Sequence, residues 1–216
     1  PKVYWNTDKI IKWFNSFRKF NYHKNDTAHL EFHGGEPFLV PVSEMQYVYD
    51  ATKGLWNNQS YGVTTNLVFK LKDEHIDFMK GPLGNRCGTS WDPNIRFANE
   101  KQFNLWKRNV ATLIDEGVTV KLFISVTKDT VRIEPIELLK WVKDLGVQEM
   151  ALERLTGNGN ANLHPEIFPT NIEQDKWFLK MHEQMKQYKA RKWFENEFFE
   201  TIYSKFTAGD NTQGTF

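Results

Sequence analysis

One short segment of the sequence combines residue types that are suited to holding a ligand. Residues 33–37 read HGGEP and follow a run in which apolar and polar residues alternate. Gly34 and Gly35 allow a ligand to approach the backbone closely and expose main-chain N–H and C=O groups. Glu36 supplies a carboxylate suited to an ammonium group, and Pro37 stiffens the exit. The segment predicts either a loop that binds an amino group or a tight strand-to-helix turn in which Glu36 is a solvated charge.

The elements that must position this segment alternate along the chain between strands and helices. Apolar spacing and turn residues predict helices over 7–20, 41–56, 72–81, 99–117, 134–146 and 171–192, with Thr7 and Ser43 as N-caps of the first two. They predict strands over 28–34, 61–68, 85–92, 118–126 and 147–155. This alternation indicates an α/β fold with a parallel sheet, either doubly wound or a barrel of β/α units.

Polar and small residues gather where each predicted strand ends. In both candidate folds, ligands bind at the carboxyl ends of the strands, so these ends are the candidate site. Ordinary loop composition is the alternative explanation, since every strand must end in a polar loop. The five segments are HGGEP (33–37), TTNL (64–67), TSWD (89–92), SVTKD (125–129) and ERLTGNGNA (153–161).

Composition narrows the classes of protein to which the chain can belong. It has 216 residues and a formal net charge of +1, which gives no electrostatic case for binding nucleic acid or a membrane surface. No apolar run approaches the ~20 residues of a transmembrane helix, so we expect a cytoplasmic protein. The single cysteine, Cys87, excludes a disulfide within the chain and a four-cysteine metal site. Because the chain starts at Pro1 without a signal-peptide pattern, we expect it to be part of a longer protein.

The five segments together resemble a known family. LEFHGGEPFL (30–39) resembles the second-strand motif of the radical S-adenosylmethionine (SAM) enzymes, in which a GGE or GGEP segment holds the amino group of SAM. TTNL is similar to the end of the family's third strand, TSWD to its fourth-strand S-x-D, and LFISVTKDTV (122–131) to its fifth-strand segment. LERLTGNGNA (152–161) resembles the sixth-strand pattern of the branch that contains SPASM-type maturases. The resemblance spans about residues 28–161 and keeps the family's order.

The resemblance implies a fold, cofactors and partners. The fold would be a partial (β/α)6 TIM-like barrel with parallel strands, whose first strand is missing from this chain. A [4Fe–4S] cluster would pass one electron to SAM, which cleaves to methionine and a 5′-deoxyadenosyl radical that abstracts hydrogen from substrate. The implied activity is that of an oxidoreductase or maturase acting on a peptide or protein, with flavodoxin or ferredoxin as electron donor.

The resemblance also assigns roles to residues at the strand ends. Gly34, Gly35, Glu36 and Pro37 would hold the methionine amino group of SAM. His33 would point near the reaction centre as a catalytic residue, or would be satisfied inside the barrel.

Further SAM contacts are implied at the other four strand ends, where an arginine fork suits a carboxylate. They are Ser90 and Asp92 near the ribose and carboxylate, Asn66 on the same face, Ser125 and Val126 beside the ribose or adenine, and Arg154 and Leu155 at the methionine carboxylate and adenine.

One defining feature of the family, the Cys-x3-Cys-x2-Cys loop that ligates the cluster, is absent from the sequence. Cys87 is single, lies within a predicted strand and is expected to be buried. Either the chain is a truncated enzyme whose cluster ligands lie upstream of Pro1, or it is a cluster-free barrel. We therefore expect a truncated radical SAM core over residues 1–192, followed by a C-terminal helix and linker over 193–216.

Two other functions are consistent with the sequence. The first is a binding module that kept the barrel and lost the cluster. The second is an ordinary β/α enzyme with a phosphate site at TGNGNA (156–161), although this segment lacks both a P-loop lysine and the G-x-G-x-x-G spacing.

Overall fold

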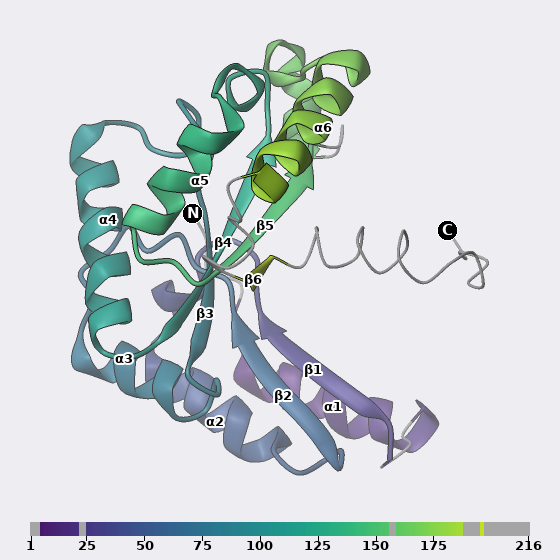
Figure 1. Cartoon of the computed structure of the whole chain (residues 1–216). Helices are drawn as coiled ribbons and strands as arrows, with labels where there is room; N and C mark the ends of the chain where they lie inside the picture. Colours follow the sequence, from purple (N-terminus) through teal and green to yellow (C-terminus); the bar gives the residue numbers. More distant parts are fainter. Residues whose placement is uncertain (1–4, 22–24, 156–158, 188–194, 197–216) are drawn as a thin grey trace.

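The computed structural model describes residues 5–21, 25–155, 159–187 and 195–196 of the chain. Helices and strands alternate throughout these residues (Figure 1). The helices are α1 (Thr7–Asn21), α2 (Val42–Thr52), α3 (Asp73–Lys80), α4 (Glu100–Asp115), α5 (Pro135–Asp144) and α6 (Asn171–Gln187). The strands are β1 (Thr27–Phe32), β2 (Asn58–Val63), β3 (Arg86–Ser90), β4 (Thr119–Val126), β5 (Glu149–Arg154) and β6 (Glu195–Asn196).

All strand pairs are parallel, and the strand order follows the chain order. One sheet pairs β1 with β2, and a second has the order β3-β4-β5-β6. A parallel bridge between Thr64 and Gly88 links the end of β2 to β3. A doubly wound sheet would reverse its order at a switch point, whereas a barrel keeps sequential order. The predicted partial (β/α)6 TIM-like barrel is therefore confirmed.

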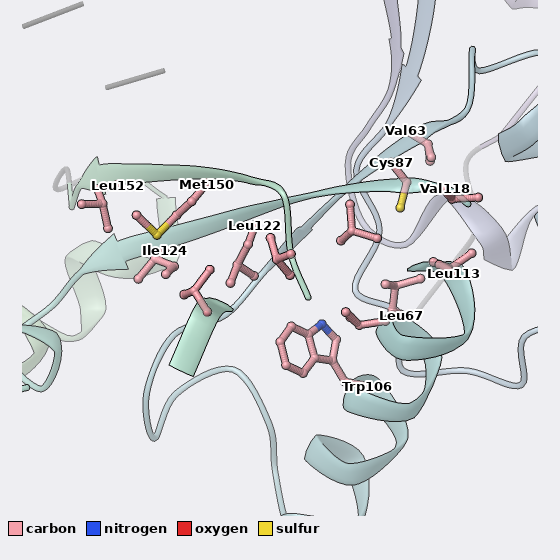
Figure 2. Packing of buried hydrophobic residues seen from close by; sticks show 14 of the residues in the cluster. Val63, Leu67, Cys87, Trp106, Leu113, Val118, Leu122, Ile124, Met150 and Leu152 are labelled. Carbon is pink, nitrogen blue, oxygen red and sulfur yellow. The ribbon is translucent and has the colours of Figure 1, made fainter. Parts of the chain in front are cut away.

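The two faces of the strands differ in burial. Along β4, residues that face the helices are buried and alternate with half-buried residues on the opposite, concave face. Leu122 and Ile124 from β4 pack with Met150 from β5 on the helix-facing side, and Trp106 of α4 approaches them (Figure 2). This apolar packing between strands and helices stabilises the sheet, so the opposite, concave face can carry polar side chains.

Local sequence signals explain several helix ends. The Asn99 side chain caps α4 by accepting a hydrogen bond from the Gln102 main-chain N–H at 3.0 Å. Trp106 and Leu113 bury the apolar stripe of α4, and Gly117 follows that helix with φ = 80°. Pro135 occupies the first turn of α5, where its missing N–H costs nothing.

The first two helices are capped differently from the sequence prediction. Asn6, and not Thr7, caps α1, because the Asn6 side chain accepts from the Lys9 N–H at 2.9 Å. The Thr7 hydroxyl donates instead to Glu44 on α2. Ser43 lies inside α2, which starts after Pro41 with no side-chain cap.

Strand β2 ends at Val63, before the predicted end at residue 68. The chain turns here, and Leu67 has φ = 52°, outside the conformation of a strand. The end of the helix predicted over 171–192 and the proposed domain boundary lie outside the described residues. Of the C-terminal helix and linker predicted over 193–216, only Glu195–Asn196 are described, and they form strand β6, because they pair with β5. None of the described helices has the length and apolar content needed to cross a membrane.

Candidate functional site

The HGGEP segment forms an open loop directly after β1. Gly34 and Gly35 have φ values of 89° and 57°, in the region that favours glycine. A Cβ added at either position would meet no atom within 4 Å, so the backbone there is open to a ligand. His33 is exposed at the start of the loop. The geometry agrees with close backbone approach, and the roles assigned to these residues stay predictions.

Glu36 is not a solvated charge, because its carboxylate ties the loop to the end of β2. Its Oε1 accepts from the Phe38 N–H at 3.1 Å and from the Thr65 hydroxyl at 2.7 Å. Its Oε2 accepts from the Asn66 N–H at 2.7 Å. Pro37 is buried and starts a short 3-10 helix (Pro37–Leu39) that Glu36 caps. Three of about four lone-pair positions of this carboxylate are therefore used within the chain.

Asn66 closes the turn after β2 with its side chain. Its Oδ1 accepts from the Val68 N–H at 2.7 Å. Its main-chain N–H is the donor to Glu36, so both groups stabilise the strand end. The predicted contact of Asn66 with SAM would use the remaining amide N–H groups of its side chain.

The ends of β3 and β4 are joined through Asp92. This buried carboxylate accepts from the Ser125 N–H at 3.1 Å through Oδ1, and its Oδ2 lies 3.0 Å from Nη2 of Arg96. Ser90 and Ser125 are half-buried, and both lie on the concave side of their strands. The structure therefore places Ser90, Asp92 and Ser125 at the ends of two neighbouring strands, with Asp92 engaged in positioning β4, and their contacts with SAM stay predictions.

Two predicted site side chains lie on the helix-facing side of the strands. Val126 is completely buried there, and its carbonyl oxygen accepts from Nε2 of Gln174 on α6 at 3.1 Å. The Arg154 guanidinium donates to Oε1 of Gln174 at 2.9 Å, pairs with Asp175 and lies 5.3 Å from the Phe178 ring centre.

These positions constrain the predicted contacts. A role of Val126 beside the ribose or adenine would use its backbone, because the side chain is part of the core. For Arg154 to bind the methionine carboxylate of SAM, as predicted, its guanidinium would have to release its α6 partners Gln174 and Asp175. Leu155 follows β5 and is half-buried.

Sequence reasoning missed a cavity of about 390 Å³ on the concave face, below the strand ends, in which several charged and polar side chains stand among apolar ones. Its lining includes His29, Glu31 and Thr64 on the β1–β2 side, and an ion pair between Arg86 and Glu149 on the other. The signal was present in the sequence, since polar residues alternate at positions 29, 31 and 33 of a predicted strand.

Cys87 lies on the opposite, buried side of β3, as the sequence predicted. Burial, with a smaller contribution from the negative charge of Glu31, raises the pKa of its thiol to about 12. Among the described residues, no group of three or more His, Cys, Asp or Glu side chains could hold a metal ion. The described residues therefore do not fit a [4Fe–4S] cluster, which needs several thiolates.

Comparison with solved structures relates this fold to SAM-binding proteins. The chain superimposes on native anSMEcpe with bound AdoMet with a TM-score of 0.71 and 14% identity, over 97% of this chain and 60% of that one. A structure of anSMEcpe with AdoMet and the Kp18Cys peptide gives a TM-score of 0.71 at 12% identity, over 94% of this chain and 58% of that one. Streptococcus suis SuiB bound to its precursor peptide SuiA gives 0.61 at 11% identity, over 87% and 41%.

At 11–14% identity, these likenesses show that the chain shares its fold with structures that contain bound AdoMet or a bound peptide, as the predicted radical SAM barrel requires. The chain spans 60% or less of the length of these structures. No protein-family model and no curated protein sequence matches the chain.

Proposed function

We propose that this chain is the SAM-binding core of a radical SAM enzyme that modifies a peptide or protein. One observation carries the proposal. The open Gly34–Gly35 backbone lies at the carboxyl end of a barrel strand, and the barrel has the same fold as a protein structure that contains bound AdoMet. Gly34 and Gly35 offer main-chain carbonyl groups to the ligand's ammonium group. Glu36 holds this loop in place, and Ser90 and Ser125 supply hydroxyl groups on the same face.

A peptide or protein is the proposed substrate because two of the similar structures contain peptides in addition to the shared fold. The concave cavity below the strand ends offers room for part of such a substrate. We assign the cluster ligands to polypeptide upstream of Pro1, with a flavodoxin or ferredoxin as electron donor. A groove of about 640 Å³ runs between α1 and β1, and a preceding strand placed there would extend the barrel.

The experiment that tests this proposal uses the full-length protein, reconstituted anaerobically with iron and sulfide. With dithionite and SAM, we expect formation of 5′-deoxyadenosine. Substitution of Gly34 by Val should abolish SAM binding, because φ = 89° strains a β-branched residue and its side chain would occupy the ligand's position. Absence of 5′-deoxyadenosine from a protein with an intact cysteine triplet and intact Glu36 would refute the enzyme proposal.

The alternative function is a cluster-free barrel that acts as a binding module. Its specific support is that the described residues provide no cluster ligands and that Cys87 is buried. The sequence immediately upstream of Pro1 decides between the two, since a Cys-x3-Cys-x2-Cys triplet there favours the enzyme. Its absence, together with SAM binding that needs no iron, favours the binding module.

A further inference from the structure

The concave face of β1 and β2 carries a continuous row of four hydrogen-bonded side chains. The Ser60 Oγ lies 2.9 Å from Nδ1 of His29, and Nε2 of His29 lies 2.9 Å from Oε2 of Glu31. The Thr64 hydroxyl donates to Oε1 of Glu31 at 2.8 Å. An ionised carboxylate only accepts hydrogen bonds, so His29 carries a hydrogen on Nε2. The row ends at Thr64, where β2 stops.

Two glycines make room for this row. A Cβ on Gly62 would lie 2.0 Å from Oε2 of Glu31, a separation that real atoms do not reach. A Cβ on Gly88 would lie 3.1 Å from the Thr64 hydroxyl oxygen and 2.7 Å from the Phe123 ring. The positions of the Glu31 carboxylate and the Thr64 hydroxyl therefore depend on the absence of side chains from neighbouring strands.

The row fixes which hydrogen-bonding group Thr64 presents. A hydroxyl has one hydrogen, and the Thr64 hydroxyl gives it to Glu31, so toward the rest of the cavity it offers only lone pairs. The Thr64 N–H donates to the Phe32 carbonyl at 3.1 Å, which places Thr64 beside the start of the His33–Gly34 loop. The Glu36 carboxylate in that loop already accepts three hydrogen bonds. Within the described part of the chain, no hydrogen bond to the Thr64 hydroxyl oxygen is present, so it is available as an acceptor next to the candidate site.

We propose that the Thr64 hydroxyl accepts a hydrogen bond from the ammonium group of the ligand held at the Gly34–Gly35 loop, and that Glu31 is the positioning residue that orients it. The inference rests on the proposed function, in which this ligand is SAM. The negative charge of Glu31 on the same wall also favours an ammonium group. The cations that face the cavity are Arg86, which pairs with Glu149, and Lys121, whose Nζ lies 5.4 Å from the Phe123 ring centre.

The test compares two probes on the reconstituted full-length protein, by equilibrium binding. SAM carries the ammonium group, whereas 5′-methylthioadenosine keeps the adenosine and lacks it. In Glu31→Gln, the amide can donate to Thr64 and turn the hydroxyl hydrogen toward the ligand. We expect SAM affinity to fall about ten- to a hundred-fold, and 5′-methylthioadenosine affinity to change less than about twofold.

Matched variants distinguish an effect on the orientation of the Thr64 hydroxyl from a general loss of structure. Thr64→Val should weaken SAM binding to the same extent, Thr64→Ser should restore it, and the Glu31→Gln/Thr64→Val double variant should lose no more than either single variant. Glu149→Gln changes another carboxylate of the same cavity and should leave SAM affinity unchanged. The melting temperature of each variant shows whether it folds. If Glu31→Gln fails to fold, the comparison of Thr64→Ser with Thr64→Val decides the test.

The outcomes distinguish this inference from the proposed function. Equal weakening of both probes, unchanged SAM affinity in Glu31→Gln, or additive effects of the two single variants would each overturn the role of Thr64 and Glu31. The proposed function would survive those results if the unmodified protein binds SAM and forms 5′-deoxyadenosine. If the unmodified protein does neither, both proposals are wrong.

Discussion

The β1–β2 side and the β3–β5 side of the barrel hold their strand ends by different means. On the β3–β5 side, continuous pairing and completely buried side chains such as Leu122 fix the strands. On the β1–β2 side, most residues of β1 are exposed or half-buried. There, the carboxylates of Glu31 and Glu36 accept hydrogen bonds from residues at the end of β2. Apolar packing is non-directional, whereas hydrogen bonds to a carboxylate fix atom positions. The side that carries the glycine loop therefore uses two carboxylates to hold one strand end, whereas the β3–β5 side uses Asp92 in addition to its buried layer.

The largest expected effect is in the core of the β3–β5 side. Leu122→Ala should lower the free energy of unfolding by about 3 kcal/mol, because it removes a fully buried side chain and leaves a cavity. Leu30→Ala on β1 should cost only about 1 kcal/mol, since Leu30 is half-buried at the margin of the core. Urea unfolding measures both. Equal losses would remove the distinction between the two sides.

The next effect concerns the two strand-end carboxylates. Glu36→Gln should cost about 2 kcal/mol, because an amide NH2 group would face one of the three donors that the carboxylate now accepts. Asp92→Asn should cost about 1 kcal/mol, because its remaining oxygen still accepts from the Ser125 N–H and mainly the ion pair with Arg96 is lost. Urea unfolding at pH 7 compares them, and a larger loss for Asp92→Asn would reverse the proposed order.

Alkaline pH tests the buried face of β3. Burial raises the pKa of the Cys87 thiol from 9.0 to about 12, so the folded chain keeps the proton that the unfolded chain releases. This stability is complete below pH 9 and is lost as pH rises toward 12, with a contribution of about 1.4 kcal/mol lost at pH 10.

The difference in stability between the unmodified chain and Cys87→Ala, measured at pH 8 and pH 10, isolates this contribution. The thiol should also react with Ellman's reagent at pH 8 only after denaturation. Rapid reaction in the native protein would place Cys87 at an accessible surface instead.

The smallest effect is expected at the end of β5. Arg154→Lys should change the free energy of unfolding by less than about 1 kcal/mol, because the ion pair with Asp175 is half-exposed. If Arg154 stays on α6 when the ligand binds, SAM affinity should be unchanged as well. A strong loss of SAM affinity with unchanged stability would show that the guanidinium moves to the ligand, as the sequence resemblance implies.

The sequence predicted the alternation of helices and strands well because apolar periodicity and turn residues act locally. The helix predicted over 99–117 appears as α4, and the helices predicted over 72–81 and 134–146 appear as α3 and α5. The predicted cap of α1 was wrong, because Asn6 caps the helix and Thr7 instead bonds to Glu44 on another helix. The predicted cap of α2 was wrong, because the helix starts directly after Pro41 and Ser43 lies inside it. The end of β2 was wrong because Glu36, from a different strand end, holds the turn that terminates it.

By itself, the sequence determined the order of the β/α units, the open glycine loop at Gly34 and Gly35, and the buried position of Cys87, because each follows from local pattern or residue type. Only the tertiary structure decided how the side chains are used. It placed Arg154 and Val126 on the helix side, engaged Glu36 and Asp92 in holding neighbouring strands, and assembled the row from Ser60 to Thr64. The physical reason is that these contacts join residues 20 to 48 positions apart in the chain, and the pairing of the strands and the packing of α6 set which of them meet.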